Sequence, residues 1–153
     1  MLYTDEKLGL WVPIALLLFA AVNFAVPSGF WFRVDRLDVH DGVYGQPIIV
    51  DYDREIIRPF TADWRVKIRR ASGDGLEWVC ASPLQREDYD DRSRKPQPVT
   101  LEWLAWTDPR CYELTPGDYV MTVTWELNPD GLQSLFLRRT VSMTDSFTIE
   151  AAL

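Results

Sequence analysis

The sole histidine of the chain, His40, is the first candidate for chemistry. It lies in the stretch DVHDGVYG between Asp38 and Asp41, so an imidazole and two carboxylates could form part of a catalytic or metal-binding cluster. The alternative, which we favour, is a solvated histidine at a strand end before an Asp-Gly turn. No Gly-x-Ser-x-Gly, P-loop, His-Glu-x-x-His or GxGxxG pattern occurs in the chain. We therefore expect no catalytic residue and no enzyme, with a hydrolase centred on His40 as the minor alternative.

Two acidic stretches, DYDRE at residues 51–55 and EDYDD at residues 87–91, offer oxygen ligands for calcium. Calcium requires several oxygens that converge on one point. Both stretches carry an adjacent arginine, and both lack the EF-hand spacing with its central glycine. We therefore interpret them as solvated loops with local ion pairs, and we expect no metal site and no cofactor.

The chain has two cysteines, Cys80 and Cys111, each at the edge of an apolar segment. A disulfide between them would close a loop of about thirty residues and stabilise the fold by roughly 3–4 kcal/mol in the chain-entropy model. Two unrelated buried thiols are the alternative. A structural zinc site is disfavoured, because two cysteines and one histidine need carboxylate help and no Cys-x-x-Cys occurs. We expect the disulfide, which would place the domain in an oxidising compartment.

Apolar and polar residues alternate along much of residues 32–153, which indicates strands with one buried face. FRVDRLDV should form the opening strand, LRRTVSM another near the end, and SFTIEA the last. No long helical period occurs after residue 31, so about seven or eight short strands predict a mainly β fold, an antiparallel β-sandwich. The residues expected to face its core are Ile48, Val50, Tyr52, Trp64, Val66, Ile68, Leu76, Trp78, Cys80, Val99, Leu101, Trp103, Ala105, Phe147 and Ile149.

The stretch LTPGDYVMTVTWEL, residues 114–127, combines a tight turn, a tyrosine and a long amphipathic strand. Its Leu114, Pro116, Gly117 and Tyr119 resemble the tyrosine corner of immunoglobulin-like and fibronectin-III-like domains. In those domains the tyrosine enters a strand, and its hydroxyl bonds back to the backbone upstream.

This resemblance implies an Ig-like β-sandwich over residues 32–153, with Trp64 as the candidate for the buried core tryptophan. The cysteines depart from the antibody pattern, in which the second cysteine lies two residues after the corner tyrosine. Here Cys111 precedes Tyr119. We therefore expect a bridge that tethers a long loop, in place of the usual disulfide between the sheets.

Arg65, Lys67, Arg69 and Arg70 form a basic stripe along one predicted strand of an acidic chain. A solvated outer face is the default interpretation, and a surface for an acidic partner is the sharper one. The stretch SPLQREDYDDRSRKPQP, residues 82–98, is charged and breaks the alternation. We expect it to be a long exposed loop and a second candidate interaction surface.

An uncharged apolar stretch, residues 8–26, has roughly the nineteen residues that a bilayer core requires of a helix. Trp11 and Trp31 flank it, as interfacial aromatics would. A cleavable signal peptide is the alternative, but the segment before the stretch is more acidic than basic and no clean Ala-x-Ala site follows. We predict a short tail at residues 1–7 and a transmembrane signal anchor at residues 8–31.

The charges that flank this segment do not favour export. Arg33 and Arg36 follow it and only Lys7 precedes it, so a count of positive charges would place the C-terminal domain in the cytoplasm. The disulfide expected between the cysteines argues for the opposite orientation. We place the domain outside the cytoplasm, in the periplasm or at the cell surface.

The net charge of −7 argues against nucleic-acid binding, which usually rests on a basic surface. Without a catalytic set, we expect a non-enzymatic single-pass membrane protein whose domain binds a protein partner in or at the membrane. It would serve as an accessory or scaffold subunit of an envelope complex, with no small-molecule substrate. A viral or prophage component that uses the sandwich for decoration or adhesion is the alternative. Since a fold of this kind hosts many functions, the partner itself is not predicted.

Overall fold

The computed structural model of the protein describes residues 5–25, 27–73, 75–90, 99–106, 108–129 and 139–152. The predicted tail at residues 1–7 lies mostly outside the described residues, as does the stretch 91–98 of the predicted loop.

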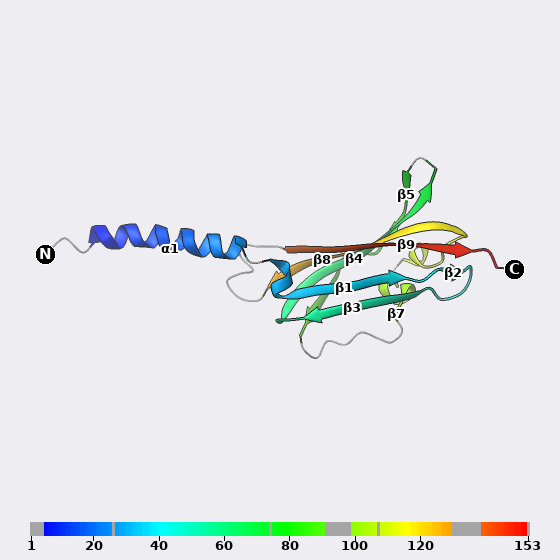
Figure 1. The fold of residues 1–153 in the computed structure, drawn as a ribbon, viewed down its shortest axis with the longest axis horizontal. Coiled ribbons are helices and arrows are strands. Elements are labelled where there is room, and N and C mark those ends of the chain that lie inside the picture. The colour runs from blue at the N-terminus through cyan, green and yellow to red at the C-terminus, as the bar shows by residue number, and fades with distance from the viewer. Residues whose placement is uncertain are drawn as a thin grey trace.

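An N-terminal helix, α1 (Asp5–Ala25), covers the apolar stretch in which the anchor was expected. It projects from one end of the β domain (Figure 1), and a short 3-10 turn, η1 (Ser28–Phe30), connects it to the first strand. Within the described part of the chain, no helix combines the length and the hydropathy of a membrane span. The helix is therefore present, but its predicted role as an anchor is not confirmed.

The larger sheet contains six strands. The two longest lie at its centre as an antiparallel pair, β4 (Phe60–Ser72) and β8 (Gly117–Pro129). Next to β8 lies β9 (Arg139–Glu150), which also pairs with the short β2 (Gly42–Val43). The other edge of β4 is shared by β5 (Gly75–Ala81) and β6 (Gln85–Tyr89).

The smaller sheet has the order β1-β3-β7 and consists of β1 (Phe32–Val39), β3 (Ile49–Ile56) and β7 (Val99–Thr100). All strand pairs in both sheets are antiparallel except β2–β9, which is parallel. The prediction of a mainly β fold is thus confirmed, and the opening strand has the predicted bounds. The larger sheet is mixed, where a purely antiparallel arrangement was expected, and the smaller sheet is antiparallel as expected.

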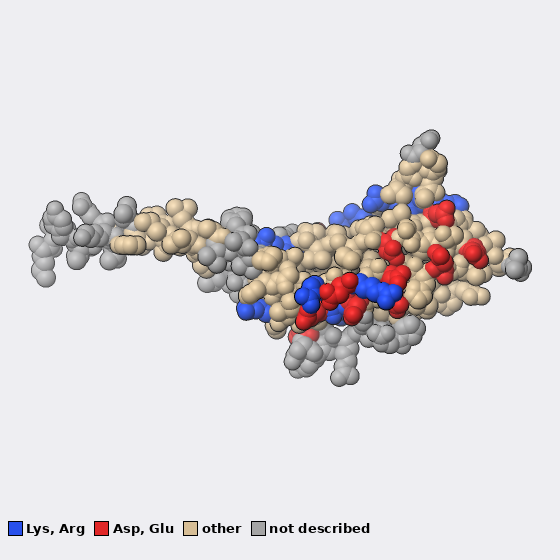
Figure 2. Space-filling model, viewed as in Figure 1, with Lys and Arg blue, Asp and Glu red and all other residues tan. Residues whose placement is uncertain are grey.

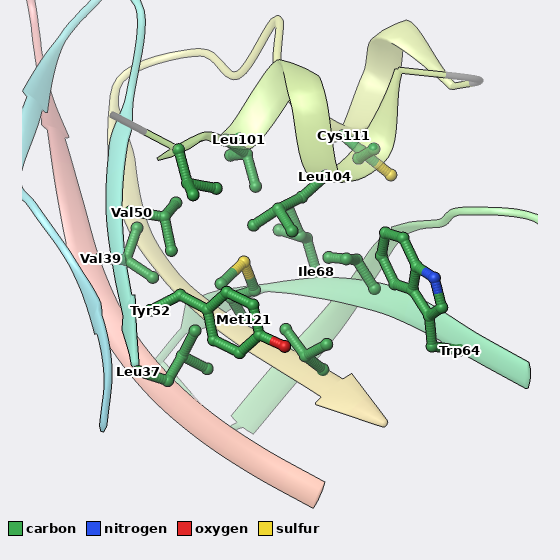
Figure 3. Packing of buried hydrophobic residues seen from close by; sticks show 14 of the residues in the cluster. Leu37, Val39, Val50, Tyr52, Trp64, Ile68, Leu101, Leu104, Cys111 and Met121 are labelled. Atoms are coloured by element: carbon green, nitrogen blue, oxygen red, sulfur yellow. The ribbon is translucent and has the colours of Figure 1, made fainter. Parts of the chain in front are cut away.

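The inner faces of the two sheets share one hydrophobic core (Figure 3). The Tyr52 ring of β3 stacks on Trp125 of β8 with centroids 5.6 Å apart, and Phe32 of β1 lies 5.5 Å from the same indole. Burial of each large apolar side chain stabilises the fold by about 1.5–3 kcal/mol. Most of the predicted inward residues are buried: Ile48, Val50, Tyr52, Trp64, Val66, Ile68, Cys80, Val99, Leu101, Ala105, Phe147 and Ile149.

The stretch VTLEWLA is not the strand that its alternation suggested. After β7 it forms the helix α2 (Leu101–Ala105), in which Leu101 and Leu104 are buried while Trp103 is 41% exposed. Thr100 caps the helix, because its Oγ1 accepts a hydrogen bond from the Trp103 amide at 3.2 Å. The buried residues of this stretch have helical spacing, which the two-residue period had obscured.

The stretch LEWVC is also only partly inward-facing. Cys80 is buried, but Leu76 and Trp78 are 48% and 58% exposed. The register of β5 against β4 shifts between the Ile68–Cys80 and Arg69–Trp78 pairs. A bulge of this kind places an extra residue in one strand and changes which side chains face the core.

Two further boundaries differ from the prediction. Part of the predicted loop 82–98 is the strand β6, which adds to β4 and buries Tyr89. The two strands predicted near the C-terminus are one continuous strand, β9, in the part that the structure describes. The strand β6 was not predicted because charged residues occupy its polar outer face. One of them, Asp88, accepts a hydrogen bond at Oδ1 from Thr61 Oγ1 at 2.7 Å.

Candidate functional site

Three of the four residues in the predicted basic stripe share the outer face of the larger sheet. Arg65, Lys67 and Arg69 alternate along β4 with buried residues, so they point away from the core. None of the three forms an ion pair with another residue in the described part of the chain. Figure 2 shows basic side chains along the upper margin of the domain, near the β5 hairpin.

Arg70, the fourth residue, belongs to a different environment. It lies opposite the buried Tyr119 in the β4–β8 register, whereas Arg69 lies opposite Val120. Its Nη2 donates a hydrogen bond to the Pro116 carbonyl oxygen at 2.7 Å, and its guanidinium lies 5.8 Å from the centre of the Tyr119 ring. Arg70 therefore supports the tyrosine corner and does not continue the stripe.

An exposed tryptophan extends the basic surface onto β5. Trp78 pairs with Arg69 across the two strands, and directly paired residues of neighbouring strands lie on the same face of a sheet. With 58% of its surface exposed, Trp78 presents a large apolar area beside a cation. Tryptophan and arginine are the side chains most enriched at the centres of protein interfaces.

Hydroxyl groups cover the same face on β8 and β9. Thr122 and Thr124 lie opposite Lys67 and Arg65 in the β4–β8 register. Their hydroxyls lie 3.0 Å from Thr144 Oγ1 and 3.1 Å from Ser142 Oγ. We call the surface made by Arg65, Lys67, Arg69, Trp78, Thr122 and Thr124 the basic face.

One donor of the basic face is buried without a partner. The Nε of Arg65 is enclosed and makes no hydrogen bond to any residue that the structure describes. The basic face thus combines cations, hydroxyl groups and one exposed indole on the outer face of the sheet, the kinds of group that complement a negatively charged surface.

The tyrosine corner has the predicted hydrogen bond. The Tyr119 hydroxyl donates to the Thr115 carbonyl oxygen at 2.7 Å, and its ring stacks on Phe147 with centroids 5.7 Å apart. Gly117 begins β8 with a φ of +151°, a conformation that side chains disfavour. The corner therefore fixes the end of β8 that lies next to Arg70.

The predicted disulfide between Cys80 and Cys111 is present, with Cα atoms 5.6 Å apart. Both cysteines are buried. The bond connects β5 to the 3-10 turn η2 (Pro109–Cys111), so it fixes the α2–η2 segment to the larger sheet. The disulfide was also expected to tether the ends of residues 82–98, but residues 91–98 lie outside the described part of the chain.

The structure places His40 close to acidic groups. Of the two that its sequence neighbours suggested, Asp38 and Asp41, only Asp38 is among them. His40 Nε2 lies 3.0 Å from Asp51 Oδ2, and the ligand atoms of Asp38, His40 and Asp51 all lie within 4.8 Å of one another. Asp41 instead accepts a hydrogen bond from the Thr148 amide at 2.6 Å. Only the pairing of β1 with β3 places Asp51 opposite Asp38, so adjacent residues alone did not predict it.

This cluster is exposed and already partnered. Arg36 pairs with Asp38, and the hydrogen bond between them lowers the pKa of the Asp38 carboxyl. Three exposed groups with an arginine among them are typical of a solvated surface. We assign no catalytic or metal-binding role to this cluster.

The two acidic stretches examined for calcium lie mainly in strands, not in the solvated loops that were predicted. Residues 51–55 belong to β3, and residues 87–89 belong to β6. Local ion pairs are present, for example between Glu55 and Arg33 of the adjacent β1, and Figure 2 shows alternating acidic and basic side chains over β1 and β3.

Within the first stretch, Arg54 is enclosed by two tyrosines. Its guanidinium lies 4.7 Å from the centre of the Tyr89 ring and 5.4 Å from that of Tyr52. Burial raises the pKa of Tyr52 to about 12 and also raises the pKa of Tyr89. This arrangement stabilises the core through cation–π contacts.

Comparisons of the chain with protein-family models, with curated proteins and with solved structures found no match.

Proposed function

We propose that this chain is a non-enzymatic, single-pass membrane protein that presents an immunoglobulin-like domain outside the cytoplasm. In this role it binds an acidic surface of a protein partner as an accessory or scaffold subunit of an envelope complex. The observation that carries the proposal is the basic face, on which three cations without ion-pair partners in the described chain lie beside the exposed Trp78.

The proposed anchor is supported by the composition of α1. Trp11, Leu16, Leu17 and Leu18 are all more than 60% exposed, at 66%, 63%, 70% and 63%. Adjacent residues of a helix point in different directions, so apolar side chains surround this part of α1. A helix that is apolar on all sides requires an apolar environment, which a bilayer supplies.

The proposed location outside the cytoplasm is supported by the disulfide. A bond between Cys80 and Cys111 persists in an oxidising compartment and is rare in a reducing cytosol. The immunoglobulin-like assignment is supported by the tyrosine corner, where the Tyr119 hydroxyl bonds back to Thr115.

The test is to purify the full-length protein from native membranes in mild detergent and to identify what accompanies it by mass spectrometry. Lys67→Glu with Arg69→Glu reverses two charges of the basic face without touching the core. Arg33→Glu with Arg36→Glu makes the same charge change on β1 and serves as the matched control. We expect a stoichiometric partner that is lost with the first pair and retained with the second.

Two results would contradict the proposal. Purification of the protein without a stoichiometric partner would contradict the accessory-subunit role. Equal retention of the partner by both double variants would show that the basic face is not the binding surface. A photoreactive residue at Trp78 provides a direct check, because it should crosslink to the partner.

A further inference from the structure

A pocket of about 350 Å³ lies at the end of the domain opposite α1. Figure 1 shows β2 and the C-terminus at this end, with α1 at the other. Four separate segments line the pocket: the turn at residues 43–48, Glu102 of α2, residues 112–114, and Ile149 of β9. It is thus distinct from the basic face, which lies on the outer surface of the sheet.

The pocket is lined by apolar side chains and by negatively charged carboxylates. Ile48, Leu114 and Ile149 are buried side chains that provide apolar contact. Glu102 and Glu113 are exposed at the pocket, and neither side-chain carboxylate forms a hydrogen bond or ion pair with another described residue. Among the described residues that line the pocket there is no lysine or arginine.

Two aromatic rings complete the lining. Tyr44 is half exposed and Tyr112 is partly buried, and both line the same pocket as the carboxylates. Aromatic faces attract cations, and carboxylates attract them more strongly. A ligand group that complements the apolar side chains, the aromatic rings and the carboxylates has a positive charge at the end of an apolar stem. Arginine and lysine side chains have this form.

The walls of the pocket are held by main-chain hydrogen bonds. In the turn, the Tyr44 amide donates to the Glu150 carbonyl at 2.9 Å and the Gln46 amide donates to Val43 at 3.0 Å. Gly45 has a φ of +83°, a left-handed conformation that a glycine adopts without strain. The Leu101 amide donates to the Ile48 carbonyl at 2.9 Å, which joins α2 to this turn.

The disulfide fixes the remaining wall. The amides of Tyr112 and Glu113 both donate to the Pro109 carbonyl, at 3.1 and 2.8 Å, so both follow the position of η2. Cys111 in that turn is bonded to Cys80 of β5. A site whose walls are held before binding loses less conformational entropy when its ligand arrives.

We propose that this pocket binds a basic side chain, of arginine or lysine, that a protein partner presents on a loop or chain end. The apolar stem packs on Leu114 and Ile149, and the cationic group lies between Glu102 and Glu113 near the tyrosine rings. The volume is at the lower end for small-ligand sites, which suits one side chain with its adjacent backbone. This second contact goes beyond the proposed function, because it uses the opposite charge and a different surface.

The test uses Ac-Gly-Arg-Gly-amide as the probe and Ac-Gly-citrulline-Gly-amide as its neutral isostere. The full-length protein in mild detergent carries ¹³C-methyl isoleucine, so Ile48 and Ile149 report on the pocket while Ile14 and Ile68 serve as references. We expect the arginine peptide to shift the two pocket methyls saturably, at millimolar concentration. The citrulline peptide should shift them at least about five-fold less at the same concentration, since it keeps the shape and lacks the charge.

Charge-neutral variants separate the pocket from the overall acidity of the chain. Glu102→Gln with Glu113→Gln should weaken binding of the arginine peptide at least about five-fold. Glu77→Gln with Glu126→Gln removes the same charge elsewhere and should leave binding unchanged. Equal shifts with both peptides, no shift at Ile48 and Ile149, or equal weakening by the two double variants would each overturn the proposal.

Discussion

The guanidinium of Arg70 lies directly over Gly117, so closely that a Cβ on the glycine would be 2.7 Å from Arg70 Nη2. The same Nη2 donates to the Pro116 carbonyl. The conformation of Gly117 and the position of Arg70 therefore depend on each other at the start of β8. Arg70 does not share the surface of its neighbour Arg69, because adjacent side chains of a strand point to opposite faces of the sheet.

Gly117→Ala should lower the free energy of unfolding by roughly 1–3 kcal/mol, because the new side chain strains the backbone and displaces Arg70. Urea unfolding measures the change. Arg70→Ala, alone and combined with Gly117→Ala, completes a double-mutant cycle that measures the coupling between the two residues. If the two effects are additive, the displacement of Arg70 contributes nothing to the loss of stability in Gly117→Ala.

Tyr119→Phe removes one hydroxyl and keeps the ring that stacks on Phe147. It should lower the free energy of unfolding by about 1 kcal/mol, since the hydrogen bond to Thr115 is lost and the carbonyl loses a partner. The urea midpoint should fall with an unchanged m-value. Tyr112→Phe is the control, because no hydrogen bond of its hydroxyl is seen within the described residues, and its midpoint should not change. A midpoint for Tyr119→Phe equal to that of the wild type would mean that the corner bond adds no net stability.

Stability should decrease between about pH 10 and pH 12. Burial raises the pKa of Tyr52 in the folded state to about 12, from an ordinary value of 10.0. Because the folded pKa is raised, the neutral phenol favours the fold fully below pH 10, and this contribution is lost as the pH rises through 12. The loss over this range is on the order of 2–3 kcal/mol, which chemical unfolding at successive pH values can measure.

Substitution identifies the group responsible for this alkaline loss. Tyr52→Phe should lessen the decrease, since phenylalanine keeps the stacking on Trp125 and cannot ionise. The remaining decrease comes from the buried Tyr89, whose pKa is also raised by burial, so Tyr52→Phe with Tyr89→Phe should lessen it further. Tyr44→Phe changes a half-exposed ring and should leave the profile as it is. A wild-type stability that is constant from pH 9 to pH 12 would contradict the burial of a neutral phenol.

Cys80→Ala with Cys111→Ala should lower the free energy of unfolding by roughly 3–4 kcal/mol, since the bond closes a loop between residues 31 positions apart. A reductant should destabilise the wild type by a similar amount and leave the variant unaffected. Gel mobility should also shift with reductant only in the wild type. If the wild type unfolds identically with and without reductant, the bond is not formed in the purified protein.

The alternation of apolar and polar residues was sufficient to predict the central strands. In β3 and β4 it placed Val50, Tyr52, Trp64 and Val66 in the core, where the structure has them. The corner hydrogen bond was implied by the resemblance of Pro116, Gly117 and Tyr119 to the tyrosine corner of immunoglobulin-like domains, and the disulfide was expected from two cysteines at segment edges. These features depend on local sequence or on a pairing with only one possible partner.

Other features depend on contacts that local sequence does not contain. A single bulge in β5 exposes Trp78. The residues on either side of Trp78 in the sequence do not indicate this bulge. The sequence VTLEWLA fits the two-residue period of a strand as well as it fits a helical turn. The cap that Thr100 provides favours the helix α2. The pocket could not be predicted, because Glu102 and Ile149 meet only after the two sheets have packed.

The length of β8 sets how far the pocket stands from α1. This strand has 13 residues and runs from the corner beside Ile149 to the pairing of Pro129 with Phe60, close to the start of β1. At about 3.3 Å per residue it spans roughly 40 Å. With α1 held in a bilayer, the pocket would stand at about that height above the lipid surface. A partner in the same membrane would then have to present its basic residue at the same height, so under the proposed anchoring the length of β8 would restrict which partners can reach the pocket.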